Sequence, residues 1–301
     1  MLELKHVSIK NKKRKILDEF QLSIPDGVIM GFLGSDDEAK SILLASIAGS
    51  RAPDSGEILL NQVPIYGRKN KAYMSLGYMP KKYGFSDLLR VEEYFDLFLS
   101  LYKINGRYRQ RRVDEVTELL SLQEYRTAFI GEMPADRLPF LCLGKCILHD
   151  PSWILLDEPF TRLNSAARSQ MEQVLLLLQE QGKTILINSQ LFPELIDCFS
   201  DVTIIEDGKA VVSGTVEEVY DMAIKKSPIR MRVLAGMESA LSVLKNNTLV
   251  DRVTVDGQDV IFRFNGGERE EAELLTELVS SGALIHNYMK DRINPEQIFR
   301  R

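Results

Sequence analysis

Short apolar strands alternate with helical segments through the first two thirds of the chain. Residues 28–34 form an apolar run that ends in glycine, and a helical segment, Lys40–Ile47, follows after a five-residue loop. Trp153–Leu156 and Thr184–Ile187 are further buried-type runs, separated by an amphipathic segment from Ser165 to Gln181. This alternation is typical of the parallel sheet in an α/β core. A strand, a loop and a helix in that order are also what a phosphate-binding loop requires.

Two strand patterns precede this core, at 2–10 and 16–24, and a basic turn joins them. Residues 91–149 are mainly helical in pattern, with apolar residues at helical spacing. A chain of 301 residues has the length of about two domains. We therefore predict a first domain at 1–222, with a helical subdomain at about 88–150.

A second domain is predicted at 228–301, beyond a break in the pattern near Lys225–Pro228. Its elements follow the order β-α-β-β-α-β, with a hairpin that turns at Asp256-Gly257, and this order predicts a small ferredoxin-like α+β domain. The expected elements are strand Ile229–Val233, helix Met237–Leu244, strands Arg252–Val255 and Val260–Phe264, helix Glu268–Ser280 and strand Leu284–Met289.

Composition argues against several kinds of protein. A net charge of −5 gives no reason to expect a nucleic-acid partner. The apolar runs are far shorter than the ~20 residues of a membrane-spanning helix, so we expect another protein to supply any span. Cys142, Cys146 and Cys198 are too few and too unevenly spaced for a disulfide framework or a metal site. The chain opens on a strand pattern rather than a signal peptide, and we expect a reducing, cytoplasmic environment.

The segment Leu148–Phe160 carries the most specific motif, four apolar residues that run into Asp157-Glu158-Pro159. It resembles the Walker B motif of ATP-binding-cassette (ABC) proteins. Other landmarks of that family occur in the expected order over residues 1 to about 220. They are Ile47–Gly49 and Asp54–Ile58 before this motif, and Thr184–Gln190, Ile204–Lys209 and Val212–Gly214 after it. The resemblance implies a P-loop NTPase-like nucleotide-binding domain with a mixed sheet core and a helical subdomain. The chain end, Asn294–Phe299, resembles the tail of cassettes that serve exporters.

The resemblance also places a phosphate loop, whose family pattern is G-x-N-G-x-G-K-[ST]. Here the nucleotide-binding positions are Gly34, Ser35, Asp36, Asp37, Glu38, Ala39, Lys40, Ser41 and Ile42. Two of the three glycines are replaced, although glycine lets backbone N–H groups converge on phosphate. Three consecutive carboxylates stand instead, and at ~6 Å and an effective dielectric of ~20 each repels a phosphate charge by roughly 2–3 kcal/mol, less where solvent screens it. We therefore predict weak or absent ATP binding.

Other positions that the family uses also differ. The aromatic residue that stacks on adenine has its place near Asn11, and the metal-contacting glutamine is replaced by Lys81. The switch histidine, which contacts the γ-phosphate, is Gln190, and the aspartate of the D-loop is Asn164. The signature Leu-Ser-Gly-Gly-Gln, which faces the phosphate of a partner subunit, falls at Met133, Pro134, Ala135, Asp136 and Arg137. These changes together predict a degenerate site.

Two catalytic positions persist. By resemblance, Asp157 and Ser41 would hold Mg²⁺, and Glu158 would be the general base, here vestigial. A functional interpretation keeps Asp157 and Glu158 as the remaining catalytic machinery. The alternative, which we favour, is that they are leftovers, or that Asp157 forms a salt bridge with Lys40.

The function predicted from sequence is a catalytically degenerate cassette subunit of a membrane transporter of the export type, with a structural or regulatory role. ATP and Mg²⁺ are its family cofactors. Its expected partners are transmembrane permease subunits, which dock near Lys81–Tyr102, and a second, active cassette; no nucleic acid is expected. The chain would lie in the cytoplasm, peripheral on the inner face of the membrane. One alternative is a slow but active ATPase that powers transport. Another is a soluble scaffold that uses the cassette fold.

Overall fold

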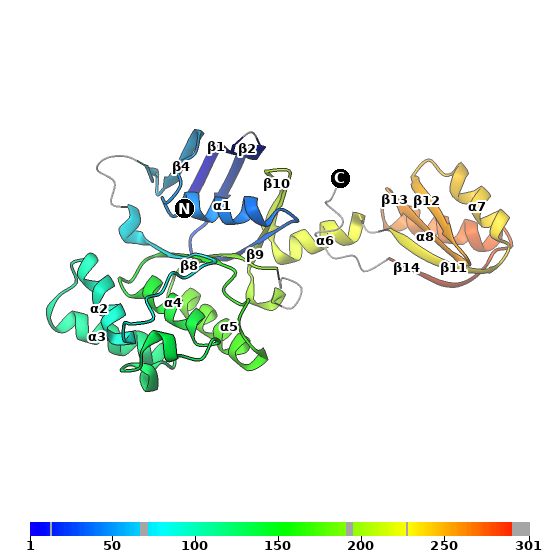
Figure 1. Ribbon diagram of the computed structural model, residues 1–301. Coiled ribbons are helices and arrows are strands. Elements are labelled where there is room, and N and C mark those ends of the chain that lie inside the picture. Colours follow the sequence, from blue (N-terminus) through cyan, green and yellow to red (C-terminus); the bar gives the residue numbers. More distant parts are fainter. Residues whose placement is uncertain (13, 67–71, 191–194, 227, 291–301) are drawn as a thin grey trace. The chain divides into compact units, whose positions relative to one another are not determined.

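The computed structural model describes residues 1–12, 14–66, 72–190, 195–226 and 228–290. The chain forms two compact units, Met1–Val216 and Glu217–Arg301 (Figure 1), which we call the first and second units. The first unit contains the strand–loop–helix pattern and all the predicted site residues. The predicted limit at 222 falls inside α6 (Val216–Lys226), and the predicted tail motif at 294–299 lies outside the described residues.

A six-stranded mixed sheet forms the centre of the first unit. Its strands are, in order, β10 (Lys209–Thr215), β9 (Asp201–Glu206), β3 (Ile29–Leu33), β8 (Thr184–Asn188), β7 (Trp153–Asp157) and β6 (Leu76–Met79). All neighbours are parallel except β10 and β9. Asn188 lies in register with Phe32 of β3 on one side and Asp157 of β7 on the other. The carboxyl ends of β3, β8 and β7 therefore meet at one edge, where ligands bind in open α/β sheets.

A smaller antiparallel sheet covers this core. Its order is β2 (Arg14–Ile24), β1 (Leu2–Asn11), β4 (Ser55–Leu60) and β5 (Val63–Pro64). Helix α1 (Asp37–Ile47) contacts β2 of this sheet and β7 and β8 of the large one. Its buried Leu43 and Leu44 join one hydrophobic cluster with Phe20 and Phe32. Both sheets thus fix α1, whose first turn contains the second half of the candidate phosphate loop.

Residues 91–149 are mainly helical, as the sequence predicts, and contain α2 (Val91–Leu101), α3 (Gly106–Leu119) and α4 (Leu138–Ile147). The helix predicted at Ser165–Gln181 is α5 (Ser165–Glu180), between β7 and β8. Short 3₁₀ turns lie at Ala72–Ser75, Gln123–Tyr125, Ile130–Glu132 and Ile196–Cys198. Arginines at the start of α3 form ion pairs with carboxylates, Arg109 with Asp96 at 2.7 Å and Arg111 with Glu115 at 2.6 Å. Arg112 also donates to the carbonyl of Ile147 at the end of α4, at 2.7 Å.

His149, just after α4, gives the first unit a pH-dependent stability. Its ring stacks on Tyr102 with centroids 3.8 Å apart, and Nε2 lies 3.0 Å from the carbonyl of Leu76. Burial lowers the pKa of His149 from 6.5 to about 4. The unfolded chain therefore binds the proton at a higher pH than the folded chain does. The stabilisation is complete above pH 6.5 and is lost as the pH falls to about 4.

We expect His149→Gln to remove this dependence. Between pH 6.5 and 4 the wild type should lose about 2 kcal/mol more unfolding free energy than the variant, allowing for partial solvent screening. Urea unfolding at a series of pH values measures both proteins. Parallel curves for the two across this window would show that His149 does not carry the effect.

The second unit has its own sheet and core. Strands β11 (Ile229–Ala235), β12 (Val250–Asp256), β13 (Asp259–Phe264) and β14 (Leu284–Lys290) are arranged in the order β12-β13-β11-β14, all antiparallel, with helices α7 (Met237–Asn246) and α8 (Glu268–Ser280). This is the predicted β-α-β-β-α-β order of a ferredoxin-like fold. Met231, Phe262, Leu244 and Leu278 are at most 1% exposed and belong to its core.

Candidate functional site

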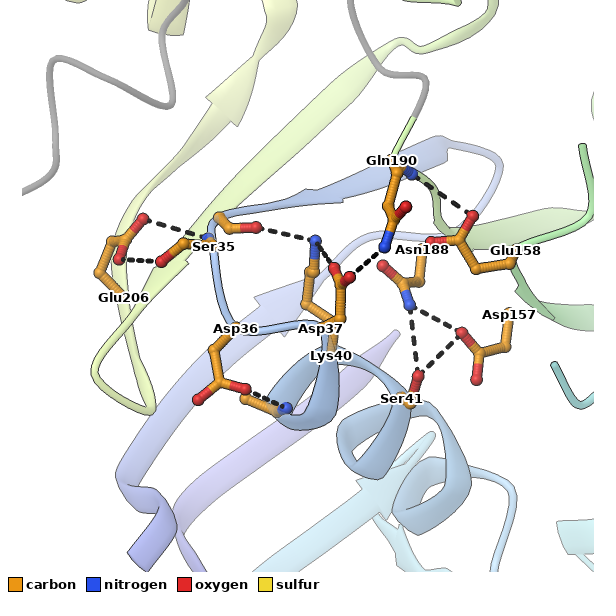
Figure 2. Close-up of polar contacts among 12 residues, drawn as sticks. Ser35, Asp36, Asp37, Lys40, Ser41, Asp157, Glu158, Asn188, Gln190 and Glu206 are labelled. Atoms are coloured by element: carbon orange, nitrogen blue, oxygen red, sulfur yellow. Dashed lines mark hydrogen bonds and ion pairs between the residues drawn. The ribbon is translucent and has the colours of Figure 1, made fainter. Parts of the chain in front are cut away.

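The loop after β3 begins with a glycine whose backbone no other residue adopts easily. Gly34 has φ of +122°, and a Cβ on it would lie 1.9 Å from the carbonyl oxygen of Ile205. Ser35 follows, and its Oγ donates to Glu206 Oε2 at 3.1 Å (Figure 2). Its backbone N–H also points to Glu206, with N and Oε1 3.4 Å apart. The start of the loop is thus held against β9.

Asp36 caps the helix that a phosphate loop would use. Its Oδ1 accepts from the backbone N–H of Ala39 at 3.0 Å, and its Oδ2 lies 2.7 Å from Arg14. Helix N-termini attract anions through their free N–H groups and their dipole. Here a carboxylate of the chain itself takes that position.

Asp37 lies between a buried lysine and the predicted switch residue. Its Oδ1 is 2.9 Å from Lys40 Nζ, and its Oδ2 accepts from the side-chain amide of Gln190 (Figure 2). Burial raises the pKa of Asp37, but the hydrogen bond and charge of Lys40, the amide of Gln190 and the charge of Lys81 lower it more. The net result is a pKa below its ordinary value. Asp37 therefore joins Lys40 of the predicted phosphate loop to Gln190 of the switch position, within range of the charge of Lys81 at the glutamine position.

Glu38 is the third carboxylate of the loop, and it too has partners within the chain. Its Oε1 accepts from Asn11 at 2.6 Å, and its Oε2 is 3.7 Å from Arg14. Asn11 is the residue near the expected adenine-stacking position. Arg14, which bridges Asp36 and Glu38, was not predicted as part of the site.

Lys40 does not pair with Asp157, and that prediction was wrong. The Lys40 side chain is 2% exposed, and its ammonium contacts Asp37 and donates to the carbonyl of Gly34 at 2.8 Å. Asp37 lies one turn earlier on the same helix, so its carboxylate reaches the lysine directly. Asp157 instead accepts from Ser41 Oγ at 3.0 Å and from Asn188 Nδ2 at 2.7 Å.

Asn188 is a site residue that the sequence did not single out. It ends β8 and is fully buried between β3 and β7. Its amide donates to Asp157 and lies 3.4 Å from Ser41 Oγ, while its Oδ1 has no hydrogen-bond partner among the described residues. The signal that could have found it is its place at the carboxyl end of a buried strand next to two other such strands. Ala39 and Ile42, also in the predicted loop, are buried in the core.

Glu158 is buried beside this network. Its Oε2 accepts from Thr161 Oγ1 at 3.0 Å and faces the backbone N–H of Gln190 at 3.4 Å. Its Oε1 is buried with no hydrogen-bond partner in the part of the chain that the structure describes, and its backbone has a φ of +57°. Burial raises the pKa of Glu158, and the hydrogen bonds from Thr161 and Gln190 offset part of that effect.

The predicted signature position forms a separate hydrogen-bonded group. Asp136 Oδ2 accepts from Asn164 Nδ2 at 3.1 Å, so the signature and D-loop positions contact each other within one chain. Asn164 also caps α5, since its Oδ1 accepts from the N–H of Ala167 at 2.9 Å. Arg137 donates to Gln170 at 3.0 Å. Met133 is buried, and Pro134 and Ala135 are exposed.

In the described part of the chain, no three side chains of His, Cys, Asp or Glu gather as a metal site. Nor does any helix there have the length and apolar character needed to cross a membrane.

The sheet, the loop and the helix that follows it define a P-loop nucleotide-binding domain, and comparisons with known proteins identify its family. Residues 17–161 match the family model described as ABC transporter. The solved structure of an ATP binding subunit of an ABC transporter has a TM-score of 0.67 to this chain at 18% identity, covering 74% of this chain and 92% of that one. The first unit contains a domain of the ABC transporter family and has the fold of the ATP-binding subunits of these transporters.

Relatives of the chain differ in length and in the direction of transport that they are named for. An uncharacterized ABC transporter ATP-binding protein of Synechocystis is 29% identical over 71% of this chain, which spans 62% of that protein's length. A Nod factor export ATP-binding protein I of Cupriavidus metallidurans is 24% identical over 99% of this chain and 96% of its own length. A probable sulfate/thiosulfate import ATP-binding protein of Chlorella vulgaris is 25% identical over 72% of this chain and 92% of its own length.

Proposed function

We propose that the chain is a cassette subunit of a membrane transporter whose own site neither binds ATP tightly nor hydrolyses it. One observation carries this proposal. The carboxylate of Asp37 contacts both Lys40 and Gln190, whose family counterparts reach the γ-phosphate. A triphosphate needs those same donors.

The other groups of the loop fit a triphosphate no better. The backbone N–H of Ala39, in the first turn of α1, donates to Asp36, and Arg14 neutralises Asp36 and Glu38 rather than an added anion. Two more carboxylates thus lie where phosphate oxygens would have to enter. Ser41 and Asp157 supply oxygen ligands of the kind that Mg²⁺ prefers. In this arrangement, however, they bond to each other and to Asn188.

A structural or regulatory role is proposed because both the phosphate loop and the signature position of this domain are altered. In the family, two cassettes pair so that the phosphate loop of each faces the signature of the other. This chain would bring an acidic phosphate loop and, at its signature position, an Asp136 that is bonded to Asn164. We therefore propose that it works beside an active cassette and transmembrane permease subunits, at the inner face of the membrane.

The permease would dock on the helical part of the first unit. Leu88, Leu97 and Leu101, in the stretch that follows Lys81 in the chain, are 84%, 48% and 67% exposed. Leu97 and Leu101 lie one turn apart on α2, and exposed apolar side chains on one face of a helix favour contact with another protein. Transport in the export direction is proposed because the likeness to the Nod factor export protein extends over 99% of this chain.

A slow ATPase is the second candidate, and Glu158 favours it. A buried carboxylate with a raised pKa and a partnerless oxygen is the kind of group that acts as a general base. Use of the cassette fold as a soluble scaffold is a third possibility, which co-purification with a membrane protein would argue against.

Hydrolysis distinguishes the first two candidates. We expect the purified chain to release phosphate from ATP and Mg²⁺ at the rate of the no-protein background, and Glu158→Gln to leave that rate unchanged. An active ABC cassette assayed alongside is the positive control. A general base contributes about 10²–10⁴-fold to a rate. A wild-type rate above background that falls by such a factor in Glu158→Gln would establish the slow ATPase instead.

A further inference from the structure

The proposed function leaves open whether the site lacks what ATP needs or is blocked by the chain itself. We propose that the Asp37 carboxylate is an internal substitute for a nucleotide phosphate, which holds Lys40 and the switch residue Gln190 together without a nucleotide. This inference rests on the proposed function and extends it from a deficient site to a self-occupied one.

The contacts of Asp37 are those of a bound anion. One oxygen faces the Lys40 ammonium at 2.9 Å, and the other accepts from the amide of Gln190 (Figure 2). The two donors come from α1 and from the loop after β8. Lys81, after β6, contributes a positive charge that acts on Asp37. Three segments that are far apart in the sequence thus converge on one carboxylate.

The neighbouring carboxylates do not share this role. Asp36 and Glu38 both contact Arg14, on β2, and among the described residues neither carboxylate bonds to the Lys40 ammonium or to Gln190. In a loop of three consecutive acidic residues, the one in the middle therefore faces the edge of the large sheet. This difference gives a matched control, because Asp37 and Glu38 carry the same charge but have different partners.

Because the Lys40 ammonium is buried, the fold is destabilised when no anion lies beside it. The Lys40 side chain is 2% exposed, and a buried charge without an opposite charge is strongly destabilising. The carbonyl of Gly34 satisfies one of its N–H groups but supplies no charge. Without Asp37, Lys40 would need another anion. A phosphate group has the charge and the acceptor oxygens to replace it.

Pyrophosphate and ATP, each titrated calorimetrically without and with Mg²⁺, test the inference on the full chain. The wild type should bind neither below the millimolar range. Asp37→Asn should bind pyrophosphate at least about tenfold more tightly, equivalent to about 1.4 kcal/mol, because it frees the Lys40 ammonium as well as removing a charge. Glu38→Gln removes a charge but leaves Asp37 on Lys40, so its gain should be clearly smaller. Asp37→Asn combined with Lys40→Ala should lose the gain.

The outcomes separate the inference from the proposed function. Micromolar ATP binding by the wild type would refute the proposed function. No binding by the wild type, together with no gain in Asp37→Asn or an equal gain in Glu38→Gln, would overturn the inference alone. Asp37→Ser, which also removes the charge, replaces Asp37→Asn if that variant is insoluble. Circular dichroism confirms that each variant is folded before titration.

Discussion

Alanine at Gly34 is expected to destabilise the first unit by at least about 3 kcal/mol. Its φ of +122° is a conformation that residues with a side chain rarely adopt, and the added Cβ would lie 1.9 Å from the carbonyl oxygen of Ile205. That oxygen belongs to β9, so relief would require the loop to separate from the strand. The loss of Ser35 contacts with Glu206 would follow.

Gly84→Ala is the matched control for this experiment. Gly84 also has a positive φ, +62°, but a Cβ there would meet nothing within 4 Å. The control should therefore show only the backbone strain, about 1–2 kcal/mol. Urea unfolding of the wild type and both variants gives the comparison. Equal losses for the two variants would mean that the contact with Ile205 is not what requires glycine.

We expect Asn188→Leu to lower the free energy of unfolding by about 3 kcal/mol or more. Asn188 is fully buried and donates to Asp157 at 2.7 Å. After the change, the carboxylate of Asp157, which is 2% exposed, would keep the Ser41 hydroxyl as a donor but lose the shorter hydrogen bond from the Asn188 amide. Leaving a buried acceptor short of a donor costs about 1–3 kcal/mol, and more when the group is charged.

A double-mutant cycle with Asp157→Leu checks the physical reason. When both partners are replaced by apolar side chains of similar shape, the buried carboxylate and amide are removed together and only the half-buried Ser41 hydroxyl loses its partners, so the cost falls. The double variant should therefore be more stable than Asn188→Leu alone, as measured by urea unfolding. A double variant that loses the sum of the two single losses would show that the Asn188–Asp157 hydrogen bond does not couple these residues.

Several elements could be predicted because their signals are local. The predicted strands Trp153–Leu156 and Thr184–Ile187, apolar except for Thr184, lie in β7 and β8, each of which ends one residue later. The helix predicted at Glu268–Ser280 has those bounds in the structure. The helix after the loop begins at Asp37 rather than at the predicted Lys40. The reason is that Asp36 caps it, a role that aspartate favours and that the pattern of apolar residues does not reveal.

The partners of the site residues could not be predicted in the same way. The sequence places Lys40, Asp157 and Gln190 in one site, but it does not reveal that Asp37 intercepts the lysine. Arg14 lies in a basic turn that is far from the loop in the chain, and the two strands of the small sheet bring it there. Such pairings depend on side-chain reach in the folded unit, which neither spacing nor periodicity determines.

The most direct test of the central claim is ATP binding by the wild-type chain, measured by isothermal titration with and without Mg²⁺ and repeated on Lys40→Ala. We predict no binding tighter than about 1 mM, equivalent to roughly −4 kcal/mol, for either protein. The acidic loop would then be a structural feature of a cassette that works through its partners. Micromolar binding that disappears in Lys40→Ala would contradict the account, because Lys40 would then hold a phosphate in spite of Asp37.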